Sequence, residues 1–207
     1  MGKKKAQGHS GDTRERILKE AEALFADKGY DSTGIDEIAR KAGITKSVIY
    51  YHFESKNDIL QTLFREYFQQ GIEFKKQYAP RTLYDKNTNM RDTMDSFLEF
   101  AEGREHVARI VLMESVKNAD RVPLFDFWER NALITSEMFP DKIKNLSRED
   151  IMFKSFLMIY MPLLGYLIFR ERWCGHFKLS KEKARELCAE ALTEYYEAIL
   201  KDLVIKQ

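Results

Sequence analysis

The sequence has little cysteine, little proline and no long uninterrupted apolar run. Its 207 residues include two cysteines, four prolines and ten glycines. Cys174 and Cys188 stand in separate segments without metal-ligand spacing, so we expect two reduced thiols, no metal site and no cofactor. The scarcity of proline and glycine, with 44% hydrophobic and 32% charged residues, favours a soluble protein rich in helix.

An excess of charge of one sign is also missing, because the formal net charge is +1. Local placement of charge must therefore support any nucleic-acid partner. The most apolar stretch, residues 151–169, is interrupted by Lys154 and Pro162, which favours a buried helix over a membrane span. Residues 1–11 contain three lysines and no apolar core. We expect a flexible basic arm, either solvated or lying on phosphates, rather than a signal peptide, and a cytoplasmic protein.

The sequence lacks the motifs of the common enzyme classes. It contains no glycine-rich phosphate loop, no His/Cys cluster at metal-ligand spacing and no nucleophile elbow, and its four histidines are scattered. These motifs supply the phosphate cradle, metal ion or activated nucleophile that such chemistry requires. We therefore predict that the chain is not an enzyme.

Helix signals follow one another from residue 12 onwards. Capping residues precede apolar residues at helical spacing, and glycines 29 and 43 can end the first two of these helices. The candidate caps are Asp12, Thr33, Thr45 and Ser55. Two short helices that meet at a glycine turn, with a helix on each side, make a helix-turn-helix in a small bundle.

The stretch 43–53 has the composition of a DNA-reading helix. Ile44 and Ile49 can anchor one side, while polar and aromatic side chains project from the other. The candidate DNA-binding residues are Thr45, Lys46, Ser47 and Tyr51 at base edges, and Thr33, Gly34, Tyr50, His52 and Lys56 at phosphates. His52 has a second interpretation, in which its ring only packs against the turn.

The pattern from Ile17 to Leu60 resembles the TetR family of repressors. The matching residues are Ala21, Leu24, Phe25, Gly29, Tyr30, Thr33, Ile38, Ala39, Ala42, Gly43, Ile49, Tyr50, His52, Phe53, Lys56 and Leu60. The chain departs from the family at one place, because Ser47 and Val48 stand where glycine or alanine and then a hydroxyl residue are common. This departure leaves the identity of the base-reading residues open.

Further helices are expected after Phe68. Asn89, Ser147 and Ser180 can cap three of them, a fourth covers about 124–138, Pro80 predicts a break and Pro162 a kink. We predict an all-α fold of about nine helices. Residues 1–11 form the arm, 12–56 a three-helix DNA-binding domain with the helix-turn-helix, and 57–207 a larger helical ligand-binding and dimerisation domain.

The resemblance implies a transcriptional regulator, with repression as the expectation. It would bind a pseudo-palindromic double-stranded DNA operator as a homodimer and be released by a small, largely apolar effector, without a membrane partner. The alternatives are an activator and a helical protein-interaction module without ligand response. The expected dimer interface on the last helix consists of Leu187, Ala191, Tyr195 and Ile199.

The middle helices contain many methionines and aromatic residues. Such residues at helical spacing usually form core, but they also suit an apolar ligand cavity of the kind that TetR-like proteins have. The candidate ligand-binding residues are Phe97, Phe100, Met113, Glu114, Phe127, Trp128, Tyr160 and Tyr166.

Overall fold

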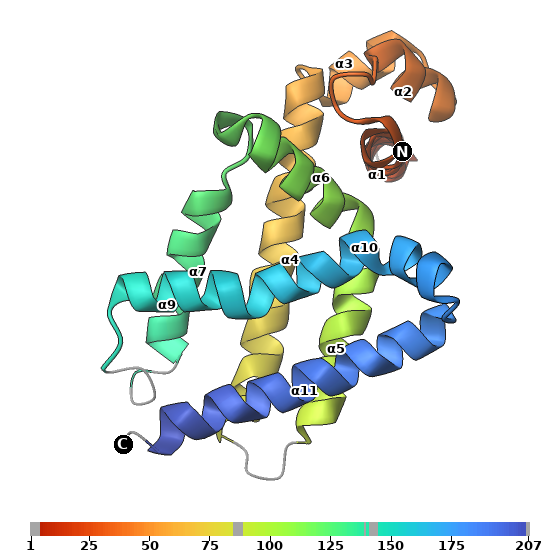
Figure 1. Ribbon diagram of the computed structural model, residues 1–207. Coiled ribbons are helices and arrows are strands. Elements are labelled where there is room, and N and C mark those ends of the chain that lie inside the picture. The colour runs from red at the N-terminus through yellow and green to blue at the C-terminus, as the bar shows by residue number, and fades with distance from the viewer. Residues whose placement is uncertain (1–4, 85–88, 139, 141–144, 206–207) are drawn as a thin grey trace. The chain divides into compact units, whose positions relative to one another are not determined.

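The computed structural model describes residues 5–84, 89–138, 140 and 145–205, and every element in these ranges is a helix (Figure 1). When Arg148–Phe177 is counted as one continuous helix, the described ranges form nine α-helices and one 3-10 turn. The predicted all-α fold is therefore confirmed. The chain divides into two compact units, Met1–Tyr67 with Arg109–Val122, and Phe68–Ala108 with Pro123–Gln207. The first unit thus includes a segment that lies far from the predicted 12–56 domain in sequence.

The first unit is built around the N-terminal helices. Its elements are α1 (Lys5–Lys28), α2 (Ile35–Lys41), α3 (Lys46–His52), the first part of α4 (Lys56–Tyr84), the last part of α6 (Glu105–Lys117) and η1 (Ala119–Arg121). Large apolar side chains from four helices are fully buried, namely Ile17, Ile38, Ile49, Ile59, Leu60 and Phe64. Burial of each stabilises the fold by roughly 1.5–3 kcal/mol. This core fixes the faces that the short helices α2 and α3 turn outward.

The first helix begins at Lys5, earlier than the predicted start at Asp12. Residues 5–11, which we expected to form a flexible arm, are part of this helix. Alanine, lysine and glutamine are good helix formers, and extending a helix is easier than nucleating one. These two effects outweigh the two glycines in the segment, each of which costs about 1 kcal/mol relative to alanine.

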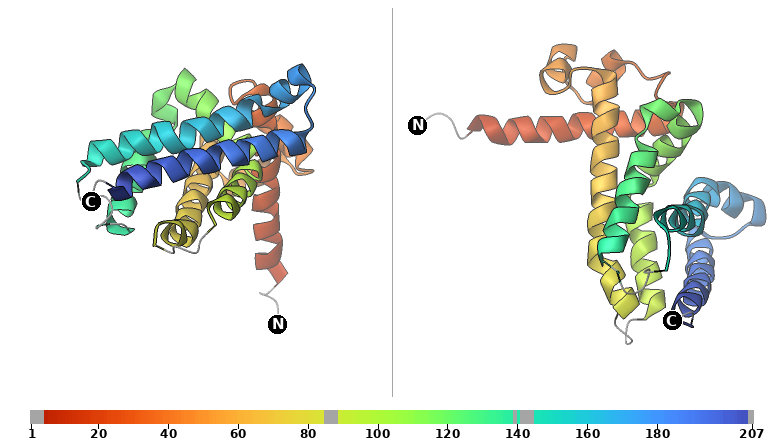
Figure 2. Two further views of the ribbon diagram at one scale, coloured as in Figure 1. Left: turned by 60° about the horizontal axis from the view of Figure 1, so that its bottom comes forward. Right: turned by 90° about the vertical axis from the view of Figure 1, so that its left-hand side faces the viewer.

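The second unit contains the remaining helices. They are α5 (Met90–Glu102), α7 (Leu124–Met138), α9 (Arg148–Ser155), η2 (Phe156–Tyr160), α10 (Met161–Phe177) and α11 (Lys181–Ile205). The caps predicted for three of them are present. Asn89 Oδ1 accepts from the Arg91 amide at 2.9 Å, Ser147 forms a capping box, and Ser180 Oγ accepts from the Lys183 amide at 3.1 Å. Helices α10 and α11 run side by side in opposite directions, as Figure 2 shows.

The two prolines predicted to disturb helices have different effects. Helix α4 continues through Pro80 to Tyr84, so the predicted break is wrong; loss of one N–H donor does not end this helix. Before Pro162 the helix widens into the π-turn η2, and the Met161 amide donates to the Phe156 carbonyl. A wider turn relieves the collision between a proline ring and the preceding helical turn.

Lys75 on α4 is a half-buried lysine in the second unit, and its ammonium is bonded to α7. Its ammonium donates to the carbonyl oxygen of Asn131 at 3.2 Å, to Asn131 Oδ1 at 2.8 Å and to the Thr135 hydroxyl on α7. In the described ranges no carboxylate lies within ion-pair distance of this ammonium. Burial therefore lowers the pKa of Lys75 to about 8, because the charged form loses hydration without gaining an opposite charge.

The Lys75 pKa makes stability depend on pH in a defined window. Between pH 8 and 10.5 the unfolded chain binds more protons at this site than the folded chain. The free energy of unfolding of the wild type should therefore rise over this window relative to Lys75→Met, by at most about 1.4 kcal/mol per pH unit. Urea unfolding of both proteins from about pH 7.5 to 10 measures the difference. The free energy of unfolding of Lys76→Met, at an exposed neighbour, should change with pH in parallel with that of wild type. Parallel curves for Lys75→Met and wild type would contradict the prediction.

Candidate nucleic-acid interface

The turn between α2 and α3 fixes the orientation of α3. Gly43 has φ +65°, a conformation that glycine adopts without strain. The Ile44 amide donates to the Ala39 carbonyl at 3.0 Å, which closes the turn. Ile38 on α2 and Ile49 on α3 are both fully buried. Helix α3 is therefore anchored by its apolar side.

The opposite side of α3 carries polar and aromatic groups in solvent. Tyr51 is 81% exposed and Tyr50 is 50% exposed, while Lys46 and Ser47 are also exposed. His52 is half-buried, and its ring stands edge-on to that of Tyr51 with the centroids 5.1 Å apart. We call the exposed side chains of Lys46, Ser47, Tyr50 and Tyr51 the α3 face.

The hydroxyl residues near the α2 and α3 N-termini bond within the protein. Thr45 Oγ1 lies 2.8 Å from Ser47 Oγ and makes no capping hydrogen bond, although Thr45 holds the N-cap position. Thr33 is 1% exposed, and its hydroxyl donates to the carbonyls of Gly29 and Leu24. Thr33 therefore ties the loop between α1 and α2 to the end of α1. The N-cap position of α2 falls to the exposed Gly34 instead of Thr33.

Lys56, a predicted phosphate contact, is bound to the loop between α1 and α2. Its ammonium donates to the carbonyl of Tyr30 at 2.8 Å and to that of Thr33 at 2.9 Å. It also lies 4.2 Å from the centroid of the Tyr30 ring, which adds a cation–π attraction. Lys56 thus holds the loop that leads into α2. A lysine near a helix start gives no sign of these contacts in the sequence.

Arg121 from η1 approaches the same tyrosine. Its guanidinium lies 4.7 Å from the Tyr30 ring centroid and donates to Glu114 at 2.6 Å and to Asp31 at 3.1 Å. Glu114 is 1% exposed, and its hydrogen bond raises the pKa of Arg121. Glu114, predicted to contact a ligand, is therefore paired with a cation inside the first unit. Tyr30 and Arg121 were not among the predicted site residues.

An ion pair joins α2 to the α3 face. Lys46 Nζ on α3 lies 3.0 Å from Asp36 Oδ2 on α2, and the two side chains are 50% and 78% exposed. The hydrogen bond to Asp36 raises the pKa of Lys46. A carboxylate thus lies beside the most basic group of this surface. Asp36 was not among the predicted site residues, and its position next to Lys46 results from the packing of α2 on α3.

The predicted ligand-binding residues fall into separate groups. In the second unit, Trp128 packs against Tyr160 with ring centroids 4.0 Å apart, and Phe127 stacks on Phe68 at 4.4 Å. The rings of Phe97 and Phe100 surround Phe74. Met113 and Glu114 belong to the first unit, where Met113 is 51% exposed.

Among the described residues of the second unit, three buried polar side-chain atoms have no hydrogen-bond partner, namely Nε of Arg170, the indole nitrogen of Trp128 and the hydroxyl oxygen of Tyr196. Arg170 is bonded through its other two guanidinium nitrogens, whereas Trp128 and Tyr196 each have one polar side-chain atom. Burial raises the pKa of the Tyr196 hydroxyl far above its ordinary value, with a smaller contribution from Tyr160. Buried polar groups in folded proteins are nearly always hydrogen-bonded, so these two atoms are candidates for contact with a polar group of a bound molecule.

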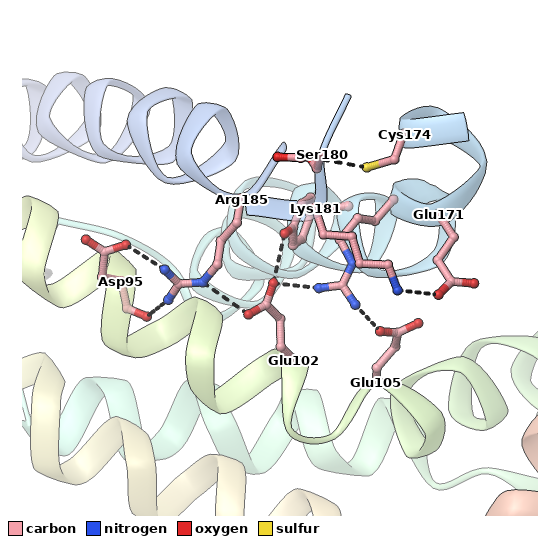
Figure 3. A network of polar contacts seen from close by, with 10 residues as sticks. Asp95, Glu102, Glu105, Glu171, Cys174, Ser180, Lys181 and Arg185 are labelled. Carbon is pink, nitrogen blue, oxygen red and sulfur yellow. Dashed lines mark hydrogen bonds and ion pairs between the residues drawn. The ribbon is translucent and has the colours of Figure 1, made fainter. Parts of the chain in front are cut away.

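A network of charged residues joins α5 and the start of α6 to α10 and α11, as shown in Figure 3. Arg170 donates to Glu102 and to Glu105, each at 2.6 Å, and Arg185 donates to Glu102 at 3.1 Å. Tyr166, a predicted ligand residue, donates to Glu102 at 2.8 Å. Burial, ahead of these contacts, raises the pKa of Tyr166 to about 12. The Tyr166 hydroxyl therefore serves to hold helices together.

The outer sides of α10 and α11 expose large apolar side chains. Phe169, Trp173 and Phe177 on α10 are each more than half exposed, and a groove of about 880 Å³ runs between them and Leu187 on α11. Of the predicted dimer residues, Leu187, Ala191 and Tyr195 are exposed, while the side chain of Ile199 lies outside the described residues.

The stretch 151–169, which lies within the helix Arg148–Phe177, was expected to be buried, and in a single chain only Ile151, Leu163 and Leu167 of its described side chains are. Only 18% of its most apolar window is buried. The helix is long and apolar enough to cross a membrane by length and composition alone, but core helices of soluble proteins meet the same criterion. Its apolar residues, including Phe169 and Trp173, leave a surface that another molecule can cover.

These features are those of a DNA-binding protein of the helix-turn-helix class. They are the glycine turn between α2 and α3, the solvent-facing α3 face and the all-helical second unit. Residues 17–63 match the family described as "Bacterial regulatory proteins, tetR family". The chain therefore carries the DNA-binding module of the TetR family of bacterial regulatory proteins, which confirms the resemblance noted in the sequence. Its relatives are regulators and not enzymes, as predicted.

Two curated relatives and one solved structure illustrate the likeness. The transcriptional activator FasR of Mycolicibacterium smegmatis is 31% identical over 100 residues, 48% of this chain and 45% of FasR. The negative regulator IcaR of the Staphylococcus aureus biofilm operon is 44% identical over 87 residues, 42% of each chain. The matches thus span less than half of either relative. FadR of Bacillus subtilis, solved in complex with stearoyl-CoA, is 15% identical with a TM-score of 0.56, over 86% of this chain and 97% of FadR.

The position of Lys56 predicts a structural rather than a DNA-contacting role. Lys56→Met should lower the free energy of unfolding by about 2 kcal/mol, because two loop carbonyls lose a charged donor. Urea unfolding followed by circular dichroism measures the change. Lys41→Met, at an exposed lysine of α2, should stay within about 0.5 kcal/mol of wild type. Equal stability of the two variants would show that Lys56 does not hold the loop.

Proposed function

We propose that this chain is a dimeric, cytoplasmic transcriptional regulator that binds a pseudo-palindromic operator and is released by a small ligand. The α3 face supports the proposal most directly. Its exposed Tyr50 and Tyr51 lie opposite the buried Ile49, on a helix held by the Gly43 turn. A helix of this kind enters the major groove with its outward side chains against base edges. Packing alone would favour apolar residues at those exposed positions.

The roles at DNA follow from the chemistry of each group. Lys46, Ser47 and Tyr51 would read base edges together with Thr45, and Tyr50 and His52 would donate to phosphate oxygens. Gly34 would offer its exposed backbone to a phosphate. Thr33 and Lys56 would support the interface from inside, since both are bonded to the loop that precedes α2.

Dimerisation through α10 and α11 is proposed because a single helix-turn-helix reads too few base pairs for useful affinity. The exposed Trp173, Phe177 and Leu187 support this interface, since a monomer rarely leaves such a continuous apolar surface in water. Two-fold pairing would present two α3 faces to successive half-sites of the operator.

A ligand site in the second unit is proposed around Phe127, Trp128 and Tyr160. The buried indole nitrogen of Trp128, which has no hydrogen-bond partner among the described residues, supports a ligand that carries both apolar and acceptor groups. The structure of FadR with stearoyl-CoA supports a ligand of this type in the family. Helix α4, Lys56–Tyr84, contributes to both units and would couple the ligand to DNA by favouring one of two states.

Repression is proposed as the output, in line with IcaR, which is a negative regulator. FasR is named an activator, so activation is the second candidate. Binding of the same α3 face to DNA serves either output, because the position of the operator relative to the promoter decides between them. A transcription assay on the DNA upstream of the protein's own gene, with and without the protein, distinguishes repression from activation.

Substitution of Tyr50 or Lys46 should weaken operator binding. Tyr50→Phe removes one hydroxyl donor and should lower affinity about fivefold, and Lys46→Ala should lower it about tenfold. Electrophoretic shift assays on a duplex selected from a random pool measure both. Lys76→Ala, at an exposed lysine of α4, serves as the control. Unchanged binding by both variants would contradict the DNA-contacting role of the α3 face.

Disruption of the α10–α11 surface should separate the dimer. Trp173→Glu places a charge on the apolar surface and should shift the mass measured by light scattering from about twice 24.4 kDa to that of one chain. Operator affinity should fall with it. Phe125→Glu, at an aromatic residue of α7 that is 73% exposed, should leave the mass unchanged. A dimer that resists Trp173→Glu, or that Phe125→Glu disrupts equally, would place the interface elsewhere.

A further inference from the structure

The ion pair between Asp36 and Lys46 places a negative charge on a surface proposed to face DNA. Asp36 is 78% exposed, and its carboxylate reaches Lys46 from the preceding helix at 3.0 Å. The neighbouring Glu37 is held differently, because it pairs with Lys28 and lies 4.0 Å from Arg40. Asp36 is therefore the acidic side chain of α2 that is committed to the α3 face.

A carboxylate at this position opposes indiscriminate binding to the DNA backbone. A free lysine ammonium gains affinity for any duplex by neutralising a phosphate and releasing counterions. Lys46 must leave Asp36 to do so, and Asp36 then lies unpaired near the negative backbone. An exposed ion pair is weak and is screened by salt, so DNA can break it. Breaking it still costs the free energy of the pair and of the repulsion between Asp36 and phosphate, which a contact to a base must offset.

At base edges, unlike at phosphates, both Lys46 and Asp36 can find hydrogen-bond partners. A lysine reads guanine at O6 and N7, and a carboxylate accepts from the N4 amino group of cytosine. The adjacent ammonium and carboxylate of this pair therefore match the donors and acceptors of a G·C pair in the major groove. The bonded hydroxyls of Thr45 and Ser47 leave Lys46 as the strongest donor of this part of α3.

We propose that Asp36 is a specificity-determining residue that holds Lys46 on the α3 face and suppresses binding to non-operator DNA. The inference rests on the proposed operator binding and adds a role for a residue outside the reading helix. Asp36 limits the affinity for phosphates that Lys46 would otherwise give, and it favours sites with a G·C pair opposite the two side chains.

The experiment compares wild type with Asp36→Asn on two duplexes of equal length, a mixed-sequence non-operator duplex and the duplex selected from a random pool. Asp36→Asn should bind the non-operator duplex about threefold to tenfold more tightly. The slope of log affinity against log salt should steepen by about 0.9 per module. Affinity for the selected duplex should rise less. The ratio of affinity for the selected duplex to affinity for the non-operator duplex should therefore fall.

Three matched variants isolate the Asp36–Lys46 pair. Asp27→Asn, at an exposed aspartate of α1, adds the same charge and should leave the affinity ratio near that of wild type. Asp36→Glu keeps the carboxylate and should behave like wild type. In a Lys46→Ala background, Asp36→Asn should change non-operator binding no more than Asp27→Asn does. Circular dichroism melts confirm that each variant is folded.

The outcomes distinguish this inference from the proposed function. If Asp36→Asn changes the affinity ratio no more than Asp27→Asn, or changes it equally in the Lys46→Ala background, the role of Asp36 is overturned while operator binding stands. If the wild type binds no duplex from the random pool, the proposed function itself fails and this inference fails with it.

Discussion

The ammonium group of Lys56 holds the loop between α1 and α2 in place, and the start of α2 in the helix-turn-helix depends on this loop. A loop of this kind has carbonyl groups without partners in regular structure, and such groups need donors when they are shielded from water. Lys56 supplies donors to two of them, from the first residue of α4. Arg121 stands over the ring of Tyr30 as well. Two residues distant from it in sequence, Lys56 and Arg121, thereby fix one short loop.

Charge is distributed unevenly over this nearly neutral chain. In the second unit, Arg170 and Arg185 are committed to Asp95, Glu102 and Glu105, so their charges serve cohesion between helices. Lys46 is half-exposed, and the one carboxylate paired with it in the described part of the chain, that of Asp36, is itself exposed. The net charge of +1 therefore says little about DNA binding. What matters is which cations remain within reach of a phosphate after the fold has paired the others.

Local features were predictable from the sequence, and features that depend on packing were not. The caps at Asn89 and Ser147 were found because a capping bond spans only two or three residues. Thr33 looked like a cap by the same rule, yet the fold buries its hydroxyl against Leu24 and Gly29. Composition suggested one ligand pocket. In the structure, however, Glu114 forms an ion pair with Arg121, and the Tyr166 hydroxyl donates to Glu102, because the rotation of each helix directs these side chains there. Such rotations are set by neighbours distant in sequence.

The π-turn Phe156–Tyr160 sets the phase of everything that follows it in the same helix. A π-turn is equivalent to one additional residue inserted into an α-helix, and each residue of an α-helix advances the side chains by about 100°. A chain shortened by one residue here would continue as a regular helix, but with Phe169 and Trp173 turned about 100° from their present direction. The presence of one residue in this turn thus determines whether the aromatic residues of α10 face solvent or the interior of their own unit.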